Sequence, residues 1–147
     1  MPSALTPSSV RRLRATLDEQ LAVLGEPAFP GSDEEAVATS ARLALRLEDP
    51  PRALLKAAVR CSLAVLADRI PGHSLEVRVP PYGAVQVIQG PRHTRGTPPG
   101  VVETDPLTWL RLALGRVDWE GAVDGHDVRA GGVRSDLSGH LPLWTDE

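Results

Sequence analysis

The feature that most constrains the fold is a change of hydrophobic period at Pro71-Gly72. Before it, the residues from Arg52 to Ile70 are aliphatic or alanine around most of a helix. After it, in SLEVRVPP, apolar residues alternate with Glu76 and Arg78, which is typical of a strand with one wet face. A largely buried helix followed by such a strand predicts an α+β fold. Helices are expected to pack against a small, mainly antiparallel sheet of about four or five strands.

Capping and breaking signals divide the rest of the chain. Proline at a first helical position, a Ser32–Glu35 capping box, and glycine or proline after the last apolar residue mark helix ends. The expected elements are helices over 7–24, 33–48 and 52–70, strands over 75–79, 84–89 and 101–104, helices over 106–114 and 119–125, a strand over 127–131 and a helical turn over 135–141. Residues 1–147 are expected to form one domain, with N-terminal helices in 1–49 and an α+β core in 50–144.

Composition excludes several classes of function. A net charge of −3 predicts no general affinity for nucleic acid. One cysteine excludes a disulfide framework, and the four histidines show no metal-ligand spacing, so neither a metal nor a cofactor is expected. The chain has no G-x-S-x-G, P-loop, G-x-G-x-x-G or H-E-x-x-H motif. No apolar run approaches ~18 residues and no leader pattern is present, which predicts a cytoplasmic protein without a membrane span.

The segment GPRHTRGTPPG, residues 90–100, is the first candidate site. Its prolines and glycines exclude a helix or a central strand. Arg92, His93, Arg95 and Thr97 are the polar side chains that a ligand would meet there. Three interpretations are open: a structural loop with arginines bonded to local carbonyls, contact with an anion or ligand, or catalysis. For catalysis, His93 is a weak candidate base, because the neighbouring arginines disfavour its protonated form.

The apolar residues of the last two expected helices are the second candidate site. Three tryptophans occur within the last forty positions, in a chain with five aromatic residues. Plain core and a ligand cavity are both compatible with this pattern, since ligand sites are concave, mostly apolar and fitted with a few polar groups. The candidate ligand-contacting residues are Trp109, Leu110, Leu114, Trp119 and Val123.

The C-terminal half resembles a known family. Its strand VVET, helix DPLTWLRLALGRVDW, short helix EGAVDG, strand HDVRAGG and ending SDLSGHLP are similar to the closing half of sterol-carrier-type lipid-binding domains. With the preceding VRVPP, GAVQ and GPRHTRGTPP, the pattern resembles bacterial, actinobacterial sterol-carrier orthologues over roughly residues 50–144. Gly100 stands where the family motif would have asparagine, and Gly131 where it would have a small hydroxyl residue.

The resemblance implies an apolar pocket between a helix layer and the sheet, and lipid or fatty-acyl binding and transfer. The first hypothesis is therefore a carrier or binding module for an apolar small molecule. Related modules lie beside mycothiol-dependent isomerase and transferase domains. The second hypothesis is therefore an isomerase-like, transferase-like or accessory role that acts on a thiol adduct, with His93 as the general base. The third is an interaction protein whose core is filled by its own side chains. No oligomeric state is predicted.

Overall fold

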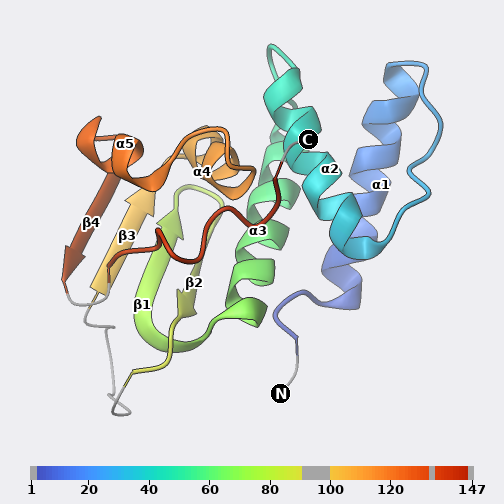
Figure 1. Cartoon of the computed structure of the whole chain (residues 1–147). Helices are drawn as coiled ribbons and strands as arrows, with labels where there is room; N and C mark the ends of the chain where they lie inside the picture. The colour runs from blue at the N-terminus through green and yellow to red at the C-terminus, as the bar shows by residue number, and fades with distance from the viewer. Residues whose placement is uncertain (1–2, 91–99, 133–134, 146–147) are drawn as a thin grey trace.

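The structure is a computed structural model that describes residues 3–90, 100–132 and 135–145. In these ranges it has five helices and a sheet of four strands, so the expected α+β class is confirmed (Figure 1). The elements are α1 (Pro7–Val23), α2 (Asp33–Arg46), α3 (Arg52–Arg69), β1 (Pro71–Val79), β2 (Gly83–Val87), β3 (Gly100–Thr104), α4 (Pro106–Ala113), α5 (Trp119–Asp124) and β4 (Val128–Gly132). The helical turn expected over 135–141 is wrong: residues 135–137 are irregular and residues 138–140 form a turn.

The sheet is mixed, with the strand order β2-β1-β3-β4. The expected hairpin β1–β2 is antiparallel, and the pair β3–β4 is antiparallel too. The central pair β1–β3 is parallel, with Leu75 opposite Gly100 and Arg78 opposite Glu103. The chain therefore forms a hairpin and then crosses to the other side of β1. This crossover was not visible in the local pattern, which indicates strands but not their neighbours.

One face of the sheet is buried and the other is charged. The buried face presents Leu75, Val77, Val79, Val87 and Val102, each at most 1% exposed. On the other face the registers align Arg78, Glu103 and Arg129 across β1, β3 and β4. Arg129 Nη2 donates to Glu103 Oε2 at 2.7 Å, and Arg78 pairs with Glu76 on its own strand. The wet face predicted from the alternation is confirmed.

Helix α3 is the centre of the packing. It contacts β1 and β2 on one side and α1 and α2 on the other, as Figure 1 shows. Its largest fully buried side chains, Leu54, Leu63 and Leu66, are at most 1% exposed. The N-terminal helices share this hydrophobic cluster with the sheet, because Leu13, Leu17 and Val37 belong to it.

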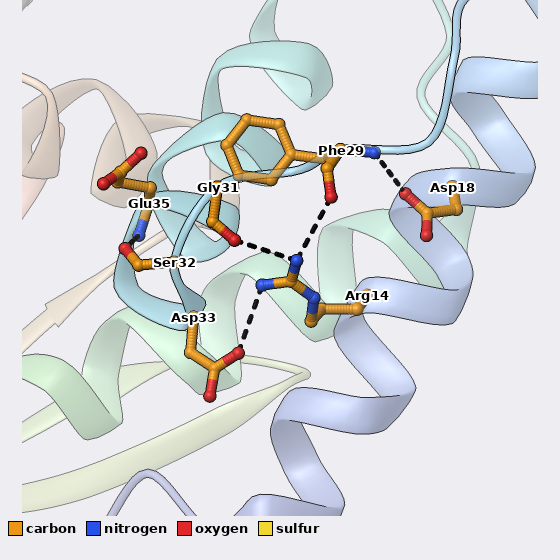
Figure 2. Close-up of polar contacts among 7 residues, drawn as sticks. All are labelled: Arg14, Asp18, Phe29, Gly31, Ser32, Asp33 and Glu35. Carbon is orange, nitrogen blue, oxygen red and sulfur yellow. Dashed lines mark hydrogen bonds and ion pairs between the residues drawn. The ribbon is translucent and has the colours of Figure 1, made fainter.

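Arg14 fixes the loop between α1 and α2. Figure 2 shows its guanidinium donating to Phe29 O and Gly31 O, at 3.1 and 2.9 Å, and to Asp33 Oδ1 at 3.1 Å. Asp18 of α1 accepts from Phe29 N at 2.8 Å. These contacts satisfy loop carbonyls and an amide that have no helix or strand partner. They set the start of α2, where Ser32 Oγ caps Glu35 N as predicted.

Candidate functional site

A cavity of about 420 Å³ lies between the C-terminal end of α4, the turn into α5 and the C-terminal segment 135–145. Small-molecule sites typically occupy about 300–1,000 Å³, so its size is in the range of a modest ligand. Its lining residues are Leu112, Leu114, Gly115, Arg116, Val117, Asp118, Trp119, Glu120, Ser138, Leu141, Pro142 and Thr145.

The first wall exists because α4 ends abruptly. Gly115 has φ 72°, which favours glycine, and Arg116 N donates to Arg111 O at 2.8 Å to close the helix end. Asp118 then caps α5 by accepting from Gly121 N at 2.6 Å. The two helices are thus joined by a tight turn, which leaves a hollow beside it.

The second wall is the C-terminal segment. The amides of Leu143 and Trp144 both donate to Ala113 O, at 2.8 and 3.0 Å. Arg69, at the end of α3, donates to Leu143 O at 2.7 Å and lies over the Trp144 ring at 5.8 Å. Arg69 also pairs with Glu34 of α2. This segment is therefore bonded to α4 and α3, and Glu34 of α2 pairs with the Arg69 side chain that contacts it.

The cavity has an apolar floor and a charged mouth. Leu112, Leu114 and Trp119 are 2%, 1% and 9% exposed. Arg116 and Glu120, in contrast, are exposed at the rim. Such an arrangement suits a ligand with an apolar body and a polar end that remains in water.

Of the predicted apolar contacts, Leu114 and Trp119 line this cavity, and Trp109, Leu110 and Val123 do not. Trp109 is 1% exposed, and its Nε1 donates to Ser62 Oγ of α3 at 2.8 Å. Leu110 is fully buried and Val123 is half-buried. The structure thus places Trp109 and Leu110 in the core, and their role as ligand contacts stays a prediction.

The polar candidates Arg92, His93, Arg95 and Thr97 lie outside the described residues. Sequence reasoning missed the walls supplied by Val117, Ser138, Leu141, Pro142 and Thr145. The glycine after α4 was visible as a helix end. However, nothing local indicated that the C-terminal segment returns to that helix.

Side chains between the helices and the sheet are tightly buried where the structure describes them. Residues that meet there, including Leu63 of α3, Val77 of β1 and Leu110 of α4, are at most 1% exposed. The cavity of about 420 Å³ in the described part of the chain lies beside α4 and α5. The pocket expected between the helices and the sheet stays a prediction.

Cys61, the one cysteine of the chain, is free and buried. Burial raises the pKa of the Cys61 thiol to about 11, and the charge of Arg12 opposes this rise. A thiol with such a pKa is a weak nucleophile at neutral pH. Among residues 3–90, 100–132 and 135–145, no group of three or more histidine, cysteine, aspartate or glutamate side chains could hold a metal ion. None of the described helices is long and apolar enough to cross a membrane.

Residues 51–143, from the start of α3 into the C-terminal segment, match the family described as "Bacterial SCP ortholog". The chain belongs to this bacterial sterol-carrier-protein-like family. The matched region contains α3, the whole sheet, α4, α5 and the C-terminal segment as far as Leu143, while α1 and α2 precede it. A sequence search of curated proteins finds no match. The resemblance seen in the sequence is confirmed at the level of the family.

Proposed function

We propose that the chain is a carrier or binding module for an apolar small molecule of acyl or isoprenoid character. The observation that carries this proposal is the cavity beside α4 and α5, with Leu112, Leu114 and Trp119 as its floor. Membership of a sterol-carrier-like family supports it independently. The polar end of the ligand would lie at the mouth, where Arg116 and Glu120 are exposed.

The affinity follows from apolar burial. Removing apolar area from water stabilises a complex by roughly 25 cal/mol per Å². Association and the ordering of a flexible chain offset a large part of this gain. A cavity of about 420 Å³ encloses a short chain rather than a large lipid, so binding in the micromolar range is expected.

An interaction protein with a filled core is the second candidate. The observation that favours it is the near-complete burial of side chains such as Leu63, Val77 and Leu110 between the helices and the sheet. Under this alternative the hollow beside α4 is an incidental surface feature and takes no cargo.

Displacement of anilinonaphthalene sulfonate by decanoate tests the carrier proposal. We expect the unmodified chain to bind the dye and to release it as decanoate is added. Ser138→Trp places an indole at the exposed rim of the cavity and should weaken decanoate binding by at least about tenfold, because the ring occupies the site. Ser8→Trp, on the exposed side of α1, is the matched control and should bind as the unmodified chain does.

The same titration separates the two candidates. Equal decanoate binding by Ser138→Trp and Ser8→Trp would show that the cavity is not the decanoate-binding site. No binding by the unmodified chain would favour the interaction protein.

A further inference from the structure

Three cations lie on one exposed face of α3. Arg52, Lys56 and Arg60 are spaced at i, i+4 and i+8, and all three are exposed. Between them, Ala53 is exposed and Ala57 is half-buried. In a helix this spacing places successive charges ~6 Å apart along one row.

Arg12 of α1 adds a fourth cation beside this row. Helices α1 and α3 run antiparallel, because Ala4 N bonds Asp68 Oδ1 at 2.6 Å while Ser9 O accepts from Cys61 Sγ at 3.8 Å. Arg12, one turn after Ser9, is close enough to Cys61 for its charge to oppose the rise in the thiol pKa caused by burial. The four cations and the two alanines are called the α1–α3 face.

In the part of the chain that the structure describes, these cations lack the carboxylate partners that several other arginines have. Arg14, Arg46, Arg69, Arg78 and Arg129 each pair with an aspartate or a glutamate. Within the described residues, Arg12, Arg52 and Lys56 make no ion pair, and Arg60 bonds a carbonyl, Tyr82 O, at 2.7 Å through Nε. Its two Nη groups are left for an acceptor.

Two of the three acids of α1 and α3 accept hydrogen bonds from backbone amides of other segments. Asp18 accepts from Phe29 N, and Asp68 accepts from the amides of Ala4 and Leu5. Glu19 is the remaining acid of these two helices. The face is therefore net positive on a chain whose net charge is −3.

The chemistry of the face selects one kind of partner. Nucleic acid is disfavoured because the chain as a whole is acidic. A bilayer contact requires apolar anchors beside the cations. The large exposed apolar residues in the described ranges are Val23 and Leu24, at the far end of α1 from Arg12. Alanine between cations instead permits close approach of another helix.

We propose that the α1–α3 face docks an acidic helix of a partner protein, whose carboxylates at i, i+4 and i+8 meet Arg52, Lys56 and Arg60. Arg12 meets a fourth carboxylate from the side. Charge complementarity of this kind sets orientation and the rate of encounter. The docking surface is separate from the cargo cavity and does not depend on the proposed function.

Fluorescence anisotropy of the full chain with a labelled helical peptide tests the proposal. The peptide carries glutamate at i, i+4 and i+8 on an alanine-rich helix, and its counterpart carries glutamine. We expect the glutamate peptide to bind and added salt to weaken it. The double variant Arg12→Gln, Lys56→Gln should bind about tenfold more weakly, since each exposed ion pair contributes up to about fivefold. Arg111→Gln, which removes an exposed α4 cation, should leave binding unchanged.

Several outcomes would overturn the proposal. Equal binding of the glutamate and glutamine peptides would show that the carboxylates are not recognised. Equal binding of the glutamate peptide by the double variant and by the unmodified chain would show that the peptide does not bind at the α1–α3 face. Binding to phosphatidylglycerol vesicles that depends on Arg12 and Lys56, without peptide binding, would make the face a lipid contact.

Discussion

Replacing Trp109 by alanine is expected to lower the free energy of unfolding by about 3–5 kcal/mol, because it empties a large buried site between α3 and α4. Trp109 is 1% exposed and is among the largest fully buried side chains of the described residues. Its indole N–H is bonded to Ser62 Oγ, so the substitution removes packing and a buried hydrogen bond together. Urea unfolding followed by circular dichroism measures the loss. A loss below about 1 kcal/mol would contradict the placement of Trp109 in the core.

A double-mutant cycle isolates the hydrogen bond. Ser62→Ala leaves the indole N–H buried without its acceptor, which costs about 1–3 kcal/mol. In Trp109→Phe the Ser62 hydroxyl still donates to Ala58 O at 2.6 Å, so no polar group is orphaned. The double variant should therefore cost less than the sum of the single variants. Strict additivity would show that the bond contributes nothing.

Gly72→Ala is expected to cost about 3 kcal/mol or more, because the methyl group would collide with backbone. Gly72 has φ 149°, and an added Cβ would lie 2.1 Å from the carbonyl carbon and oxygen of Ile88. These backbone atoms cannot rotate away, since Ile88 O accepts from Ser74 N and Ile88 N donates to Ile70 O. The irregularity between β1 and β2 at Pro71–Leu75 depends on this close approach.

Gly131→Ala is the matched control for Gly72→Ala. It lies in β4 and an added Cβ meets nothing within 4 Å. Its thermal midpoint should stay close to that of the unmodified chain, whereas the midpoint of Gly72→Ala should fall by more than about 10 °C. Equal midpoints for the two variants would show that the β1–β2 connection rearranges freely.

Local chemistry was sufficient to predict most helix starts. Thr6, Ser32, Asp105 and Asp118 each cap a helix in the structure, at the positions that the capping rules favour. The alternation in β1 likewise predicted its buried and wet faces. These features depend on residues within a few positions of one another.

Long-range features could not be predicted in this way. The parallel pairing of β1 with β3 brings together strands separated by β2, and no local pattern specifies it. The cavity wall depends on Leu143 and Trp144 reaching Ala113 O. A core tryptophan and a ligand-contacting tryptophan both require an apolar helix face, so Trp109 and Trp119 were indistinguishable in the sequence.

The difference between these two tryptophans gives the most direct test of the carrier account. One variant keeps Trp119 and carries phenylalanine at 109 and 144, and the other keeps Trp109 and carries phenylalanine at 119 and 144. Each variant is titrated with a brominated short-chain fatty acid, which quenches tryptophan fluorescence on contact. Since Trp119 lines the cavity and Trp109 is packed against Ser62, the account predicts strong quenching of Trp119 and little of Trp109. Quenching of Trp109 alone would place the cargo between the helices and the sheet, and quenching of neither would contradict the carrier function.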